Sequence, residues 1–137
     1  EIRELARGLH PSVLSERGLV KALEALVLSA AVPVDLQTED GPGPDLPEPI
    51  GAAAYYVVAE GLANTHKHAG ASRVVIRTST EGETLVVEVF DDGVGGADQE
   101  GSGLRGLADR VEALGGTLAL ESPVGGGTRL VARVPLA

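Results

Sequence analysis

The chain has 137 residues, a length that fits one domain, and 43% of them are apolar, which is enough to form a core. That core must be mainly aliphatic, since the sequence holds only two tyrosines and one phenylalanine. Its 20 acidic and 11 basic side chains give a formal net charge of −9, which argues against nucleic acid as a ligand, because phosphate backbones bind to clustered Lys and Arg. Cysteine is absent, which excludes disulfides, thiolate metal sites and thiol catalysis, and no uncharged stretch is long enough for us to expect direct membrane insertion.

Residues 1–12 predict the end of a helix and a junction. The apolar residues Ile2, Leu5 and Leu9 lie on one side of this helix, and Pro11 follows where the helical pattern ends. Because the sequence starts inside this charged helical pattern and contains no Met, we expect a piece of a longer protein. Residues 13–137 form the expected folded domain.

The elements that follow alternate helices with strands. From Ser15, apolar residues at helical spacing predict a helix that continues to Pro33, and residues 34–38 predict a short strand. After a Pro- and Gly-rich connection, residues 50–69 predict a long central helix with Gly70 as its C-terminal stop. Further strands are expected at 73–79, 84–91, 117–122 and 128–134, with a helix at 104–114. This order predicts an α+β fold, a two-layer sandwich with helices on one face of a mixed, mostly antiparallel sheet.

The second half of the central helix carries a mixed polar face. Its polar side chains project within an arc of about 100° at a turn of about 100° per residue: Glu60, Asn64, Lys67 and His68. A solvated face is one interpretation. The other is a metal bound to phosphate, because carboxylate and amide oxygens suit the ion and cationic donors suit the anion.

Asp91 continues the apolar face of a strand. Leu85, Val87 and Val89 alternate onto one face, and the period of two places Asp91 on the same face. A buried carboxylate without a partner is unfavourable, so Asp91 either reaches water in an Asp-Gly turn or receives donors from a partner or ligand. The glycine-rich segment DDGVGG begins here, where small residues allow a flat ring to approach the backbone.

A second glycine cluster, GSGLRGL, leads into the helix at 104–114. It spells GxGxxG, but a loop precedes it where a dinucleotide-binding unit would have a parallel strand, and no Gly-Lys-Ser/Thr of a Walker loop occurs. Backbone amides at the start of a helix still suit a phosphate group. On the last strand, Thr128 lies on the same inward face as Leu130, Ala132 and Val134. Its hydroxyl is therefore expected to form a hydrogen bond with either a local backbone group or a ligand.

Together these segments resemble the ATP-binding catalytic domain of sensor histidine kinases of the nitrate-sensor and desaturase-sensor type, within the ATPase superfamily that also contains gyrase. EGLANTHKHA resembles the asparagine box, DDGVGG the first glycine box, GSGLRGL the second, and GGGTRL the closing Gly-Thr strand. The resemblance covers roughly residues 13–137 and implies a Bergerat-type ATP-binding fold. The N-terminal segment is similar to the junction between the second dimerisation helix and the catalytic domain of that subfamily.

The resemblance implies a phosphate side of the site. Asn64 would coordinate the magnesium that bridges the ATP phosphates, and Glu60 would be the catalytic residue beside the metal and the reacting phosphate. Lys67 and His68 would contact phosphate oxygens. Gly101 and Gly103 would be the hinge of the lid over the triphosphate, and Leu104 of the same box would be a further ATP-binding residue.

It also implies a base side. Asp91 would accept a hydrogen bond from the exocyclic amine of adenine, and Thr128 would support the ring. The first glycine box would surround the base: Gly93, Val94 and Gly95. Asp92 departs from the family pattern, which commonly has asparagine there.

The implied function is transfer of the γ-phosphoryl group of ATP to a histidine on the dimerisation and histidine-phosphotransfer domain of the parent protein, and then to a response regulator. His10 is not the expected acceptor, because Pro11 stands where the family has an acidic residue. The chain alone should therefore bind ATP without autophosphorylation. We expect a cytoplasmic domain whose parent protein can be membrane-anchored. The alternatives are a serine kinase of the anti-sigma-factor type, a non-catalytic nucleotide-gated interaction module and a generic α+β binding domain.

Overall fold

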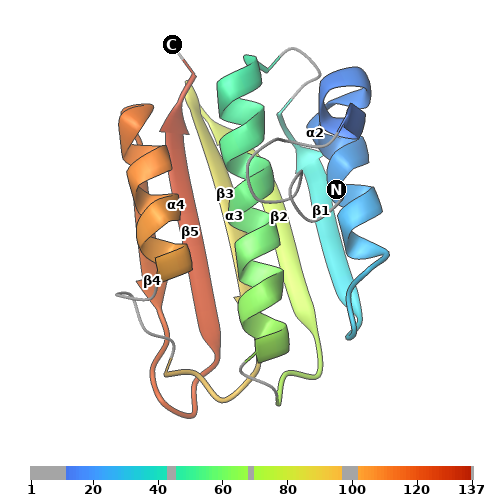
Figure 1. The fold of residues 1–137 in the computed structure, drawn as a ribbon, viewed down its shortest axis with the longest axis vertical. Helices are drawn as coiled ribbons and strands as arrows, with labels where there is room; N and C mark the ends of the chain where they lie inside the picture. The colour runs from blue at the N-terminus through green and yellow to red at the C-terminus, as the bar shows by residue number, and fades with distance from the viewer. Residues whose placement is uncertain (1–11, 43–45, 68–69, 97–101, 137) are drawn as a thin grey trace.

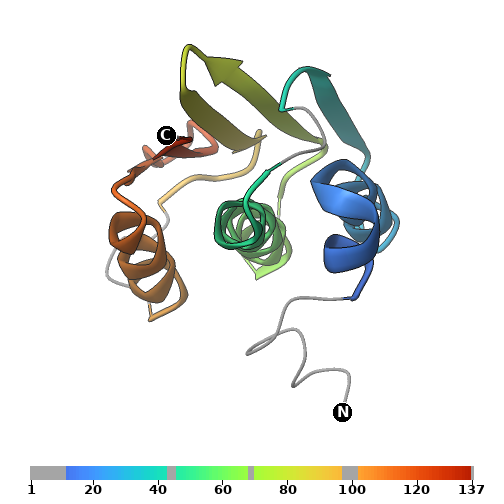
Figure 2. The ribbon, with the colours of Figure 1, turned by 90° about the horizontal axis from the view of Figure 1, so that it is seen from above.

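The computed structural model describes residues 12–42, 46–67, 70–96 and 102–136, which form a two-layer α+β sandwich. Helices α2, α3 and α4 form one layer on one face of a five-stranded sheet, and no described helix covers the other face (Figures 1 and 2). In chain order the elements are α2 (Ser12–Val27), β1 (Val34–Asp40), α3 (Glu48–Lys67), β2 (Val74–Glu81), β3 (Thr84–Asp91), α4 (Ser102–Ala113), β4 (Thr117–Glu121) and β5 (Thr128–Pro135). The predicted helix in the junction at residues 1–9 lies outside the described residues.

The sheet is mixed, with the order β1-β2-β3-β5-β4. β1 pairs with β2 in parallel, and the three other neighbouring pairs are antiparallel. The chain between β1 and β2 contains α3, because parallel neighbours need a long crossover connection. The predicted fold class is therefore confirmed.

The central helix α3 lies between α2 and α4 and packs closely on the sheet (Figure 2). Ala53 and Ala54 are fully buried, and a Cβ built on Gly61 would lie only 2.7 Å from Val89 Cγ1 of β3. Small side chains thus allow the helix to approach the strand. Although α3 has 20 residues, no described helix combines the length and the apolar character needed to span a membrane.

The core between the two layers is aliphatic, as the composition predicts. Its largest fully buried hydrophobic side chains come from the inner faces of all three helices and of the central strands: Leu23, Val57, Val58, Val74, Ile76, Leu85, Val87, Val111, Leu130 and Val134. Burial of each such side chain contributes about 1.5–3 kcal/mol of transfer free energy. The core holds α3 and α4 in fixed positions over β3 and β5.

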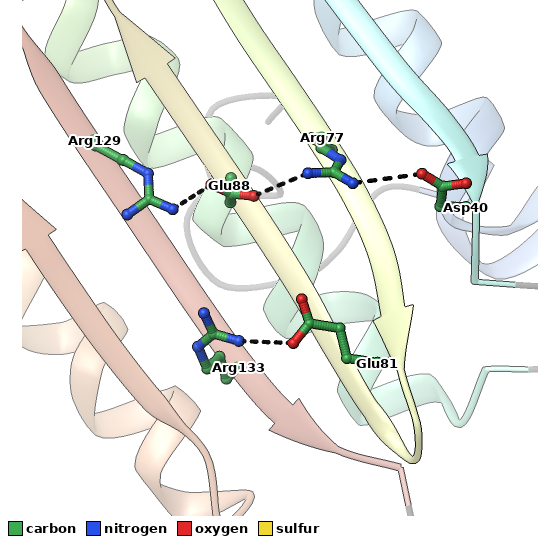
Figure 3. Close-up of polar contacts among 6 residues, drawn as sticks. All are labelled: Asp40, Arg77, Glu81, Glu88, Arg129 and Arg133. Atoms are coloured by element: carbon green, nitrogen blue, oxygen red, sulfur yellow. Dashed lines mark hydrogen bonds and ion pairs between the residues drawn. The ribbon is translucent and has the colours of Figure 1, made fainter.

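The outer face of the sheet carries a row of ion pairs that crosses all five strands. Figure 3 shows its central members, in which Glu88 of β3 lies between Arg77 and Arg129. The nitrogen–oxygen distances are 3.4 Å for Arg77–Asp40, 3.9 Å for Arg77–Glu88, 2.6 Å for Arg129–Glu88 and 3.6 Å for Arg129–Glu121. A separate pair, Arg133–Glu81, joins β5 to the end of β2 at 3.2 Å.

Helix α2 differs from the predicted helix at both ends. It starts before the predicted cap and is interrupted at Gly18, whose φ of 85° and ψ of 177° are not helical. It ends at Val27 instead of continuing to Pro33. The reason is local, because both the backbone N–H and the hydroxyl of Ser29 donate to the Leu26 carbonyl, at 3.1 and 2.7 Å, and so close the last turn.

Candidate functional site

The predicted site residues that the structure describes lie where α3 ends, β3 ends and α4 begins, in the lower half of the molecule in Figure 1. α3 supplies Glu60 and Asn64 one turn apart, and both side chains are half-buried. Lys67 is the last residue of α3, and its side chain lies outside the described part of the structure. His68 and Gly101 also lie outside the described residues.

Glu60 faces the first turn of α4. A Cβ built on Gly103 would lie 2.8 Å from Glu60 Cδ, so the glycine leaves the space that the carboxyl group occupies. Further along the same interface, the guanidinium of Arg110 lies 4.5 Å from the centre of the Tyr56 ring and joins the two helices by a cation–π contact. Leu104, the residue after Gly103, is buried in the core.

Asp91 is buried at the end of β3, with 6% of its surface exposed. The predicted alternation is confirmed, because the preceding inward residues of β3 are also buried. Its Oδ1 accepts a hydrogen bond from the Gly93 N–H at 2.9 Å, and its Oδ2 accepts one from the Thr65 hydroxyl at 3.0 Å. A carboxylate has about four lone-pair positions, so Asp91 can accept further hydrogen bonds. A Cβ on Gly93 would lie 3.0 Å from Asp91 Oδ1, so this position favours glycine.

The first glycine segment is also packed against the turn between β4 and β5. Gly95 has a φ of 72°, and a Cβ there would lie 2.9 Å from the carbonyl carbon of Pro123. Val94 stays exposed, at 55%. Two backbone hydrogen bonds join the segments: Gly96 N–H to Ser122 O at 2.7 Å and Gly125 N–H to Val94 O at 2.6 Å. Gly95 and Gly96 therefore join the segment after β3 to the turn between β4 and β5.

Thr128 lies directly opposite Asp91 in the register of β3 and β5. Thr128 is half-buried, and its Oγ1 lies 2.7 Å from the Ser122 hydroxyl oxygen. Thr128 thus borders the same end of the sheet as Asp91, and its hydroxyl is already engaged by a side chain.

Two residues near the site were not predicted. Thr65 binds Asp91 from the buried face of α3, and the signal in the sequence was a hydroxyl among apolar residues at helical spacing. Asp92 accepts hydrogen bonds from the Ser72 hydroxyl, the Ser72 N–H and the Arg73 N–H, the last two at 2.7 and 3.2 Å. These bonds, with that of the Ser72 hydroxyl the largest contribution, lower the pKa of Asp92. Asp92 therefore anchors the connection between α3 and β2.

The metal-ligating side chains and the cavity that the structure describes add no further residue to the site formed by Glu60, Asn64 and Asp91. In the described part of the chain, no three His, Asp or Glu side chains lie together as metal ligands. A cavity of about 310 Å³ lies between α4 and the last two strands. Its lining includes Leu104 but none of Glu60, Asn64 and Asp91.

Comparison with known proteins agrees with the fold and the motifs. Residues 51–137 match the family described as "Histidine kinase-, DNA gyrase B-, and HSP90-like ATPase". The chain is 32% identical over 145 residues to the sensor histidine kinase MctS of Rhizobium johnstonii, covering 98% of this chain and 31% of the relative. It is 33% identical over 144 residues to the sensor histidine kinase NarS of Mycobacterium tuberculosis, covering 98% of this chain and 33% of the relative. The chain thus spans about a third of the length of these relatives.

A solved structure shows the same architecture. The histidine kinase domain of the blue-light activated histidine kinase from Erythrobacter litoralis EL346 superposes with a TM-score of 0.66 and 28% sequence identity, covering 85% of this chain and 57% of that chain. The resemblance to sensor histidine kinases inferred from the four motifs is therefore confirmed. The chain belongs to the family of histidine kinase-, DNA gyrase B- and HSP90-like ATPases.

Proposed function

We propose that this chain binds Mg-ATP as the catalytic domain of a sensor histidine kinase, with adenine at Asp91 and the triphosphate along Glu60 and Asn64. Membership of an ATPase family supports ATP as the ligand. The observation that carries the proposal is the buried carboxylate of Asp91, which ends an apolar strand face and already accepts two hydrogen bonds from the protein. A group of this kind is suited to recognise an amine in a dry site.

The carboxylate selects the base by its hydrogen-bonding character. Adenine presents an exocyclic amine, which donates to an Asp91 oxygen. Guanine presents a carbonyl oxygen at the corresponding position, so two acceptors would face each other and neither would be satisfied. ATP should therefore bind in preference to GTP.

The residues of α3 fit a magnesium ion. Glu60 and Asn64 offer a carboxylate and an amide oxygen one turn apart, and both remain partly open to solvent. Mg²⁺ usually takes one or two protein ligands and fills its other positions with water and phosphate oxygens, so no larger cluster is needed. When bound, the ion would neutralise charge on the phosphates. We propose Asn64 as the ligand.

The remaining predicted residues have proposed roles around the triphosphate. Lys67 and His68 would supply cationic or donor groups. Gly101 and Gly103 would serve as the hinge of the lid, and Gly103 lies in the first turn of α4, where backbone amides favour a phosphate. Leu104 and Val94 would contribute apolar contacts beside the base. Glu60, whose carboxyl group lies next to Gly103, would be the catalytic residue beside the metal and the reacting phosphate, where a carboxylate can accept the proton that an attacking imidazole releases.

The acceptor would be a histidine on the dimerisation domain of the parent protein, and the phosphoryl group would then pass to an aspartate of a response regulator. The names of the relatives support these partners in general terms, since they are sensor histidine kinases. We assign the domain to the cytoplasm because ATP and a response regulator would meet it there.

Calorimetric titration of the chain with ATP and with GTP, each with and without Mg²⁺, tests the proposal. The expected result is ATP binding that needs Mg²⁺ for full affinity, weak or absent GTP binding, and loss of the ATP preference in Asp91→Asn. Asp40→Asn is the matched control, because Asp40 is an exposed carboxylate in the ion pairs of the outer sheet face. Equal affinity of the wild-type chain for ATP and GTP would contradict the assignment of Asp91.

A further inference from the structure

Thr65 is the described side chain that donates to Asp91. It lies on α3 immediately after Asn64, is 4% exposed, and places its hydroxyl oxygen 3.0 Å from Asp91 Oδ2. The other donor to this carboxylate is a backbone N–H, from Gly93. Thr65 is therefore the position at which a side-chain substitution can change the hydrogen bonding of Asp91.

The hydroxyl has one proton and two neighbouring acceptors. Its oxygen also lies 3.1 Å from the carbonyl oxygen of Gly61, one turn earlier in α3. In an α-helix that carbonyl already accepts the backbone N–H of Thr65. A hydrogen bond to an ionised carboxylate is about twice as strong as one to a neutral group, so the proton is directed to Asp91.

Both oxygens of Asp91 are then held by donors from two different segments, one on α3 and one in the glycine segment after β3. Fixing both oxygens fixes the plane of the carboxylate, and with it the direction of the remaining lone pairs. The protein itself therefore sets the orientation of the Asp91 carboxylate.

We propose that Thr65 is a positioning residue for nucleobase selection: its hydroxyl holds the Asp91 carboxylate in the orientation that accepts the exocyclic amine of adenine. This inference rests on the proposed function, because it assumes that the base lies at Asp91. Thr65 would then be a second residue that determines base selectivity, and it would act through Asp91 and not through contact with the phosphates.

The test uses Thr65→Val, which keeps the branched shape and removes the hydroxyl, and Thr65→Ser, which restores it. ATP is compared with purine riboside triphosphate, an analogue that lacks the exocyclic amine. Thr78→Val is the matched control, because Thr78 is fully buried in β2 and its hydroxyl donates to the Gly41 carbonyl at 2.9 Å, away from the site.

We expect Thr65→Val to weaken ATP about 10-fold, the size of one hydrogen bond to a charged group, while the analogue changes little. The preference for ATP over the analogue should therefore fall in Thr65→Val, return in Thr65→Ser, and stay at the wild-type value in Thr78→Val. Equal weakening of ATP and the analogue in a folded Thr65→Val variant would contradict the inference.

The outcomes separate the inference from the proposed function. If the wild-type chain does not prefer ATP over the analogue, the assignment of Asp91 fails and the inference fails with it. If the wild-type preference is present and is lost in Asp91→Asn but kept in Thr65→Val, the inference alone is overturned. Should Thr65→Val fail to fold, Thr65→Ala replaces it, and a preference kept in Thr65→Ala would overturn the inference equally.

Discussion

The close approach of α3 to β3 at Gly61 leads to a prediction on stability. A Cβ on Gly61 would lie 2.7, 2.9 and 3.0 Å from Cγ1, Cβ and Cγ2 of Val89. A rotation about χ1 of Val89 cannot relieve this overlap, because Val89 Cβ is itself one of the close atoms. Gly61→Ala therefore requires the helix to move away from the strand.

The expected size follows from two opposing terms. Replacing a helical glycine by alanine favours the helix by about 1 kcal/mol. Adding a methyl group to a closely packed site costs about 1–3 kcal/mol. We expect a net loss of about 1 kcal/mol, which corresponds to a fall in Tm of about 3–5 °C for a chain of this size.

Gly106→Ala provides the matched control. Gly106 lies in α4, is exposed, and a Cβ there would meet no atom within 4 Å. This substitution should raise the free energy of unfolding by about 0.5–1 kcal/mol. Urea unfolding and thermal scans of both variants measure the difference. If Gly61→Ala raises Tm as much as Gly106→Ala does, the close packing of α3 on β3 is wrong.

Further predictions concern the ion pairs, the acid limb of stability, the metal and the acceptor. Glu88→Gln, which removes the carboxylate between two arginines, should lower stability by about 1 kcal/mol at low salt and less at high salt, whereas Glu24→Gln, in an exposed pair with Lys21, should change Tm little. The lowered pKa of Asp92 in the folded state stabilises the protein at pH values above 3.8, the ordinary pKa of the group, and this stabilisation is lost as the pH falls through the folded-state pKa. In urea unfolding, the difference in stability between the wild type and Asp92→Asn should therefore shrink as the pH is lowered below about 3.8. Asn64→Ala should abolish the Mg²⁺ dependence of ATP affinity in calorimetry, and an unchanged dependence would contradict its role as ligand. Radiolabelled ATP should leave no acid-labile label on this chain alone, and label that disappears in His10→Ala would refute that expectation.

Much of the fold was predictable because its patterns are local. The predicted strand at 84–91 has the observed bounds of β3, since alternating branched residues fix both its length and its inward face. The same period of two placed Asp91 in the core before any contact was known. The central helix was predictable within two residues at each described end, because no proline interrupts it and Gly70, with a φ of 100°, follows.

Other features depend on contacts between distant segments. Val86 and Val131 point to the outer face of the sheet, where alternation predicts exposure, yet they are only 2% and 6% exposed. Their cross-strand partners are Arg133, of the separate ion pair with Glu81, and Glu88, of the ion-pair row. The aliphatic stems of these long side chains can cover the two valines. Pairing across strands decides this burial, and a single strand does not reveal it.

In the candidate site, too, the local pattern was predictable and the contacts between distant segments were not. The sequence indicated which residues carry the chemistry, but the anchoring of Asp92 joins residues 20 positions apart, and the bond between Thr65 and Asp91 joins residues 26 apart. The Asp92 contacts depend on the pairing of β2 with β3, and the Thr65 contact depends on the distance between α3 and β3. That distance follows from the small residues on the inner side of the helix, whose effect appears only once the two layers are packed.

A crystal structure of the chain with Mg²⁺ and a non-hydrolysable ATP analogue would test the assignment of adenine to Asp91. The exocyclic amine should lie within about 3 Å of an Asp91 carboxylate oxygen. The phosphates should lie beside Asn64, at the start of α4. Adenine bound in the cavity between α4 and β4, against Leu118 and Leu120 and away from Asp91, would refute the assignment.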